Sequence, residues 1–140
     1  MEAKRNFYLN LNGTFSIFDD QGHDVTPAGN KECALIALLA TNHLFRRSRN
    51  WIKSILWSES SPDNASSSLR QTLWRVRKHF GGSDIFIQSS STNIWLNNVN
   101  IQVLPGLNGY SVFLEGIDVL MKPSKTGSWK YGINALGFIH

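Results

Sequence analysis

Residues Pro62–Phe80 read PDNASSSLRQTLWRVRKHF, and the apolar residues of this stretch predict the element around which the chain folds. The apolar side chains are Ala65, Leu69, Leu73, Val76 and Phe80, spaced four, four, three and four positions apart. This spacing places all five on one side of an α-helix. The stretch is therefore predicted to be an amphipathic helix whose apolar side faces the core.

The opposite side of this helix is polar and basic. It carries Asn64, Ser67, Gln71, Trp74, Arg75 and Lys78, with Arg70 and Arg77 on one flank and Ser68 on the other. Asp63 or a nearby serine can cap the start of the helix, and Pro62 disfavours helix before it. Gly81-Gly82 favours the end of the helix at this point. The predicted helix is bounded at both ends and presents a basic surface.

Positive charge is concentrated in the middle of the chain. Residues 46–79 contain eight Lys and Arg against two Asp and Glu, a net charge of +6, whereas the whole chain has +4. Residues 1–45 have a net charge of −2. A local excess of this kind favours a polyanionic partner, although a charged helix face is often only solvated.

The composition is that of a folded intracellular domain. Of the 140 residues 41% are hydrophobic, which is enough for one core, and the single cysteine, Cys33, lies in an apolar run and is expected in that core. The sequence has no run of about 18 apolar residues, and residues 1–10 lack the apolar segment of a secretion signal. We therefore expect a cytoplasmic protein with no membrane partner.

The segments before the organising helix predict a small sheet followed by two helices. FYLNLNGTFSIF alternates around Asn12-Gly13 and predicts a hairpin, with His23–Val25 as a short third strand of an antiparallel sheet. NKECALIALLATNH is apolar on nearly all sides and predicts a buried helix. RRSRNWIKSILW predicts a helix capped by Ser48, and its opening arginines, Arg46, Arg47 and Arg49, suit contact with a phosphate.

After the organising helix, IFIQ and IWLN predict a β-hairpin whose tip is SSSTN. The order of sheet, three helices and hairpin is that of an α+β winged helix-turn-helix domain with a C-terminal β-hairpin wing. In this arrangement the third helix, about residues 63–80, takes the recognition position.

These segments together resemble a known family. RSRNWIKSILW, NASSSLRQTLWRVRKHF and the pair IFIQ and IWLN are similar to the OmpR/PhoB-type winged-helix domain of SARP-like and CadC-like transcription regulators, over about residues 6–104. The resemblance implies that the third helix enters the major groove and that the wing touches the minor groove or backbone of double-stranded DNA. It also implies direct-repeat sites, homo-oligomers on DNA and RNA polymerase as a partner.

Positions matched to the family give the expected site residues. Those facing the bases would be Ser67, Gln71, Trp74 and Arg75. Those near phosphates would be Ser68, Arg77 and Lys78, to which the charge pattern adds Arg46, Arg47, Arg49 and Arg70. The wing contacts would be Ser90, Ser91, Thr92 and Asn93.

Two features depart from the family pattern. Gln71 and Trp74 stand where family members set their sequence preference, so the resemblance implies no operator sequence. VFLEGIDV resembles the segment that leads into an activator domain, but three glycines and one proline interrupt the chain after Val119, which disfavours a stable helix. We expect a winged-helix domain over residues 1–104 and an appendage over 105–140, the remnant of a linker to a missing activator domain.

Enzyme motifs are absent from the sequence. It contains no G-x-S-x-G, H-E-x-x-H, G-x-x-x-x-G-K-[ST] or G-x-G-x-x-G pattern, and its four histidines lack ligand spacing. We therefore expect no catalysis, metal or cofactor. The expected function is therefore sequence-specific DNA binding in transcription regulation.

An alternative function is that of a winged-helix protein-interaction module, or of a truncated antagonist of a full-length regulator. Trp74 could accordingly contact the DNA groove, its own chain or another protein.

Overall fold

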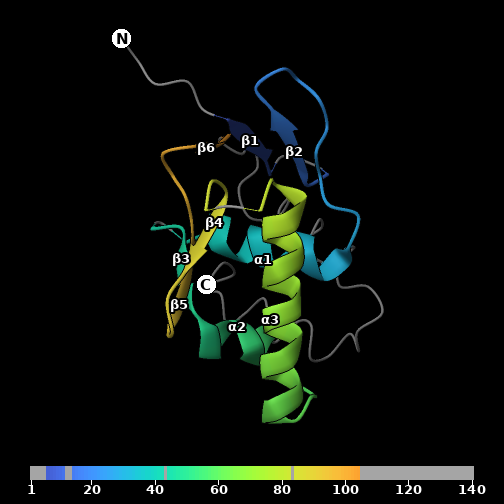
Figure 1. Ribbon diagram of the computed structural model, residues 1–140, viewed down its shortest axis with the longest axis vertical. Coiled ribbons are helices and arrows are strands. Elements are labelled where there is room, and N and C mark those ends of the chain that lie inside the picture. The colour runs from blue at the N-terminus through green and yellow to red at the C-terminus, as the bar shows by residue number, and fades with distance from the viewer. Residues whose placement is uncertain (1–5, 12–13, 43, 83, 105–140) are drawn as a thin grey trace.

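The computed structural model describes residues 6–11, 14–42, 44–82 and 84–104, so the expected appendage over 105–140 lies outside the described residues. Within them the fold is α+β, with three helices and two three-stranded sheets (Figure 1). The first sheet lies at one end of the molecule, and the longest helix runs from that end to the other. No helix in this part of the chain is long and apolar enough to cross a membrane.

The first sheet contains the predicted hairpin and one unpredicted strand. β1 (Phe7–Asn10) pairs antiparallel with β2 (Ser16–Asp19), and Leu9 and Ile17 are fully buried. The expected third strand at His23–Val25 is only a single bridge between Phe18 and Asp24. The third strand is instead β6 (Ile101–Val103), which lies parallel to β1. The expectation of a purely antiparallel sheet was therefore wrong.

The first helix is the predicted buried helix. α1 (Asn30–Ala40) is buried from Glu32 to Ala40, because its sequence is apolar on almost every side. Cys33 belongs to this core, and its thiol donates to the carbonyl of Pro27 at 3.1 Å. Burial raises the pKa of the Cys33 thiol to about 11. The thiol is a core group, as expected from the sequence.

A short strand precedes the second helix and corrects one prediction. β3 (Arg46–Ser48) contains Arg46 and Arg47, which were expected in the opening turn of that helix. α2 (Arg49–Leu56) begins only after Ser48, whose hydroxyl accepts from the backbone N–H of Trp51 at 3.0 Å. The cap was predicted correctly, but pairing of β3 with a distant strand holds the two arginines in extended backbone.

The organising helix has the predicted face in the core. α3 (Pro62–His79) starts at a cap from Ser61, whose hydroxyl accepts from the N–H of Asn64 at 3.2 Å, and Pro62 is its first residue. Gly81 and Gly82 end it with φ of 105° and 80°, a conformation that favours glycine. All five residues of the apolar stripe are buried: Ala65, Leu69, Leu73, Val76 and Phe80.

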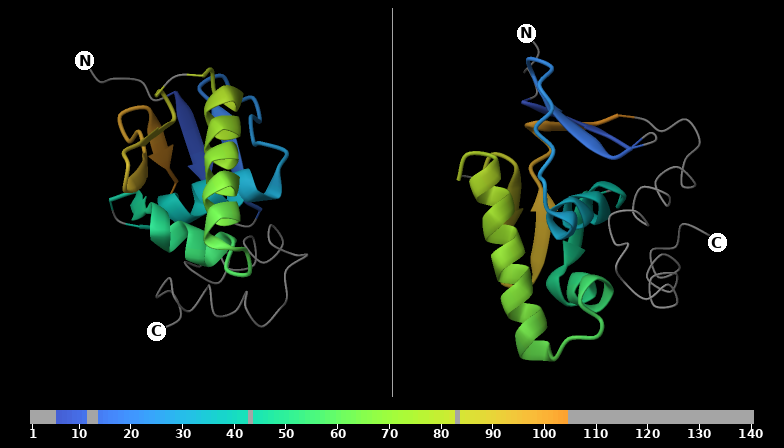
Figure 2. Two further views of the ribbon diagram at one scale, coloured as in Figure 1. Left: turned by 60° about the horizontal axis from the view of Figure 1, so that its bottom comes forward. Right: turned by 90° about the vertical axis from the view of Figure 1, so that its right-hand side faces the viewer.

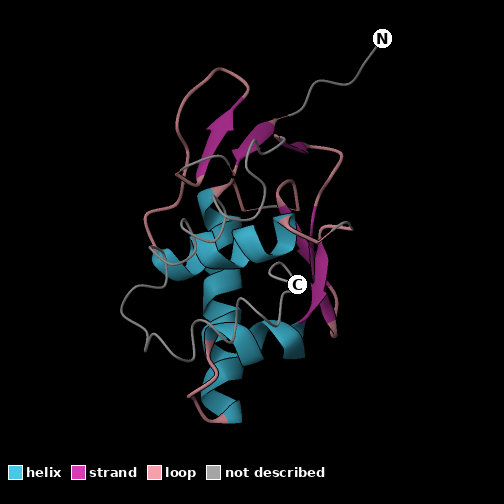
Figure 3. Cartoon of the chain, turned by 180° about the vertical axis from the view of Figure 1, so that it is seen from behind, coloured by secondary structure: helices cyan, strands magenta, loops and turns pink. Residues whose placement is uncertain are grey.

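The second sheet holds the predicted hairpin beside α3. β4 (Ile87–Ser89) and β5 (Asn93–Leu96) are antiparallel, and β5 also pairs with β3, giving the order β3-β5-β4. Both α1 and α2 pack against α3, and α1 also packs against β3 and β5 of the second sheet (Figure 2). Seen from behind, the helices pack together next to the second sheet (Figure 3). The hairpin and the outer side of α3 thus border one surface.

Three phenylalanines join the two sheets to the end of α3. The ring of Phe80 stacks on Phe86 with centroids 3.8 Å apart, and Phe7 meets these two rings edge-on at 5.1 and 5.3 Å. Phe80 and Phe86 are buried, so this cluster continues the core between the two sheets. The first sheet is thereby fixed against the end of α3.

Candidate functional site

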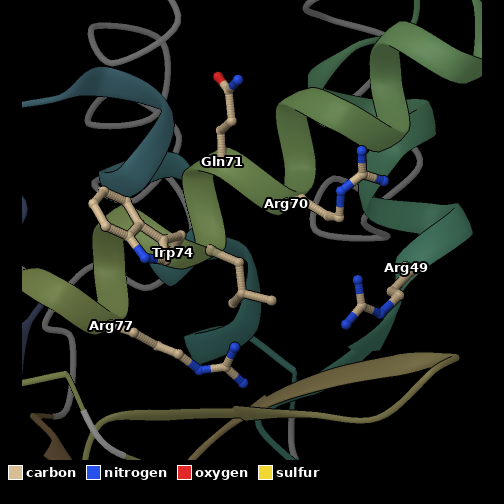
Figure 4. A pocket seen from close by; sticks show the side chains of 6 residues that line it. Arg49, Arg70, Gln71, Trp74 and Arg77 are labelled. Atoms are coloured by element: carbon tan, nitrogen blue, oxygen red, sulfur yellow. The ribbon is translucent and has the colours of Figure 1, made fainter.

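Three arginines from two helices line one pocket beside the hairpin. Arg49 comes from the first residue of α2, and Arg70 and Arg77 come from one flank of α3. Gln71, Leu73 and Trp74 complete the lining of the pocket, whose volume is about 510 Å³. Figure 4 shows the three guanidinium groups around the opening and Gln71 directed away from them. We call this the arginine pocket.

The β4–β5 hairpin holds two of these arginines in place. The Arg49 Nε donates to the carbonyl of Ser90 at 2.8 Å, and its backbone N–H donates to the carbonyl of Thr92 at 2.8 Å. The Arg77 guanidinium donates to the Ser89 hydroxyl at 2.8 Å. The pocket therefore depends on packing of the hairpin against both helices.

Negative charge near the pocket is sparse. Asp84 Oδ1 lies 4.0 Å from the Nε of Arg77, but the Asp84 side chain is 72% exposed. The buried Nε has no hydrogen-bond partner in the described part of the chain. Arg49 and Arg70 make no ion pair with any described residue; Arg70 donates to the Ser67 hydroxyl at 3.2 Å. The pKa of Arg49 is lowered by burial first, and then by the charges of Arg77 and Arg70. Such mutually repelling cations favour an anion between them.

The outer face of α3 next to the pocket carries a large exposed ring. Trp74 is 59% exposed, the ammonium of Lys78 lies 4.8 Å from its ring centroid, and Gln71 is also exposed. Ser67, one turn before Gln71 in α3, is half-buried, and its hydroxyl accepts from Arg70 at 3.2 Å. An amide, an indole and a lysine are thus available to a partner on this side of the helix.

Three arginines predicted from the sequence to belong to the site lie elsewhere. Arg75, on the opposite flank of α3, forms an ion pair with the nearly buried Glu32 of α1 at 3.7 Å. Arg46 stacks on the ring of Trp95 at 4.8 Å. Arg46 of β3 pairs with Trp95 of β5, and the neighbours of Trp95 in β5, Ile94 and Leu96, have buried side chains. Because side chains alternate between the two faces of a sheet, Trp95 and Arg46 lie on the outer face of the second sheet.

Arg47 has a structural role in the packing of α1 and α2. Its Nε donates to the carbonyl of Leu38 near the end of α1 at 3.2 Å, and its guanidinium lies 4.3 Å from the centroid of Trp51. Burial lowers the pKa of Arg47.

Ser68 also lies away from the arginine pocket, because it is half-buried on the flank of α3 that carries Arg75. The structure therefore brings neither Arg47 nor Ser68 to the pocket.

The hairpin tip forms hydrogen bonds mostly within itself. The Ser90 hydroxyl accepts from the backbone N–H groups of Thr92 and Asn93 at 3.3 and 3.1 Å, and the Asn93 amide donates to Thr92 Oγ1 at 3.0 Å. Ser91 is exposed. The predicted wing residues thus form a tight turn whose carbonyls also hold Arg49.

Comparisons with protein-family models, with curated proteins and with solved structures found no match to this chain. The chemistry of the site must therefore be argued from its own residues. Among the described residues no group of three or more His, Cys, Asp or Glu is placed to hold a metal ion.

Two residues near the pocket were missed as site residues. Lys53 donates to the Ser66 hydroxyl of α3 at 3.1 Å, and Ser89 accepts from Arg77. Lys53 stands four positions after Arg49, so both lie on one side of α2. This spacing could have identified Lys53 as a site residue. No sequence signal pointed to Ser89, because its role depends on where the hairpin packs.

Proposed function

We propose that this chain is a winged-helix protein that binds double-stranded DNA and regulates transcription. In this proposal α3 lies in the major groove, and the β4–β5 hairpin is the wing that touches the minor groove or the backbone. The order of α1, β3, α2, α3 and hairpin supports a winged helix-turn-helix, as does the resemblance to OmpR/PhoB-type domains.

One observation carries the proposal: three arginines of two helices converge beside the hairpin, and the only described carboxylate within 4.0 Å of them, that of Asp84, belongs to an exposed side chain. Phosphates of the DNA backbone are the partner that such a cluster suits, because arginine donates two parallel hydrogen bonds to a phosphate. Lys53 and Lys78 add charge on the same side, so the surface presents five cations: Arg49, Lys53, Arg70, Arg77 and Lys78.

The proposal is tested by the salt dependence of duplex binding. Each neutralised phosphate contributes about −0.9 to the slope of log affinity against log salt, so five cations predict a slope of about −4.5 for the full chain. Arg49→Ala and Arg70→Ala should each reduce the slope by about 1. Arg46→Ala is the matched control, because it also removes an arginine but lies on the outer face of the second sheet; it should leave the slope unchanged. A slope near zero would contradict DNA binding.

The exposed ring of Trp74 favours a second candidate, a winged-helix module that binds a protein. An indole that is 59% exposed leaves a large apolar area in water, which is common at sites of protein contact. This candidate predicts no salt-dependent binding to duplex DNA. The salt titration therefore decides between the two.

A further inference from the structure

Gln71 and Trp74 stand one helical turn apart on the outer side of α3, beside the arginine pocket. In the described part of the chain, the Gln71 amide makes no hydrogen bond. The Trp74 ring is covered only in part, by the ammonium of Lys78 at 4.8 Å. An amide and an apolar ring are thus presented together next to three groups that suit phosphates.

These two residues are close enough together to reach neighbouring base pairs. Positions three apart on a helix are separated by about 4.5 Å along its axis, and stacked base pairs by about 3.4 Å. When the arginines hold the backbone along the flank of α3, Gln71 and Trp74 face the floor of the major groove at successive steps.

The chemistry of each side chain selects a base. The Gln71 amide has one donor group and one acceptor, which match N7 and the N6 amino group of adenine, whereas guanine presents two acceptors there. The Trp74 ring can make apolar contact with the C5-methyl group that only thymine carries. The arginine that would read guanine, Arg75, is held toward α1 by Glu32.

We propose that Gln71 and Trp74 read an adenine and a thymine in two neighbouring base pairs of the DNA site. This assignment rests on the proposed DNA binding and deepens it, because it names the bases that the site must contain.

The test begins with selection of bound sequences from random duplexes by the full chain, which should enrich adjacent A·T pairs. In the selected duplex, 7-deazaadenine removes N7 and should weaken wild-type binding about fivefold or more. Uracil in place of thymine removes one methyl group and should weaken binding about three- to fourfold.

Substitutions assign each effect to its residue. Gln71→Ala should abolish sensitivity to 7-deazaadenine only, and Trp74→Ala should abolish sensitivity to uracil only. Lys78→Ala is the matched control on the same face and should keep both sensitivities while binding every duplex more weakly. Circular dichroism melting checks that each variant is folded.

The outcomes separate this proposal from the proposed function. Salt-dependent DNA binding without A·T enrichment, or with base sensitivities that the two alanine variants retain, would overturn the reading by Gln71 and Trp74 and leave DNA binding intact. Absence of all duplex binding would overturn both.

Discussion

Arg75 differs from the other basic residues of α3 because it forms an ion pair with a nearly buried glutamate. The Arg75 side chain is 57% exposed, but that of its partner, Glu32, is only 10% exposed. The two groups lie 3.7 Å apart, and they belong to different helices. Arg75 therefore ties α3 to α1, and a contact with a base would compete with this pair.

We predict that Arg75→Ala lowers the free energy of unfolding by about 1 to 2 kcal/mol, between the values of exposed and of buried ion pairs. Lys78→Ala, which removes an exposed cation of the same helix without an acidic partner among the described residues, should change it by less than about 0.5 kcal/mol. Urea denaturation measures both. In a double-mutant cycle with Glu32→Gln, a coupling energy near zero would show that the pair does not stabilise the fold.

Residue by residue, the sequence predicted burial better than it predicted partners. Leu69 and Val76 could be assigned to the core, because burial follows from the helical period alone. The positions of Arg46 and Arg47 could not be predicted, since each is fixed by a group of another element: the ring of Trp95 in β5 or the carbonyl of Leu38 in α1. Charge alone does not tell a cation that packs on a ring from one that faces a partner.

At the scale of elements, the start of α3 depends on a local hydrogen bond. The hydroxyl of Ser61 accepts from the N–H of Asn64, which has no acceptor inside the first turn of the helix. Fraying of this first turn would disturb the adjacent hydrogen bond between Lys53 of α2 and Ser66 of α3.

Ser61→Ala should lower the free energy of unfolding by about 1 kcal/mol, the usual effect of losing a serine cap. Ser60→Ala is the matched control, because Ser60 is exposed and its side chain makes no hydrogen bond in the described region. Thermal and urea unfolding of the two variants compare them directly. Equal stabilities would mean that the cap contributes nothing to the native helix.

The two long helices and the two hairpins could be predicted, whereas the strands β3 and β6 could not. α1 and α3 are 11 and 18 residues long, and each gives a clear pattern over several turns. β3 and β6 have three residues each, too few to display alternation, and both exist because a distant strand pairs with them. The unpredicted β3 is the reason that two arginines were assigned to the wrong element.

For the whole molecule, β6 joins the first sheet to the rest of the fold. Ile101 of β6 is 1% exposed and pairs with Phe7, whose ring packs on the end of α3. The first sheet should therefore unfold together with the helices in one transition.

We predict that Ile101→Ala lowers the free energy of unfolding by about 2 to 5 kcal/mol, as expected for a buried isoleucine, while unfolding remains a single transition. Gln102→Ala, in the same strand but exposed, should have little effect. Circular dichroism and tryptophan fluorescence should give the same midpoint for each variant. Two separate midpoints for Ile101→Ala would show that the first sheet is an independent unit.

The parallel pairing of β1 with β6 also has a consequence during protein synthesis. Phe7 pairs with Ile101, which is added to the chain 94 residues later. At about 5 to 20 residues per second, the ribosome completes β6 about 5 to 20 s after β1. For that time the edge of β1 has no native partner, and an open strand edge can pair with another chain. We therefore expect a pause in translation before residue 101 to lengthen this interval and to increase aggregation of the nascent protein.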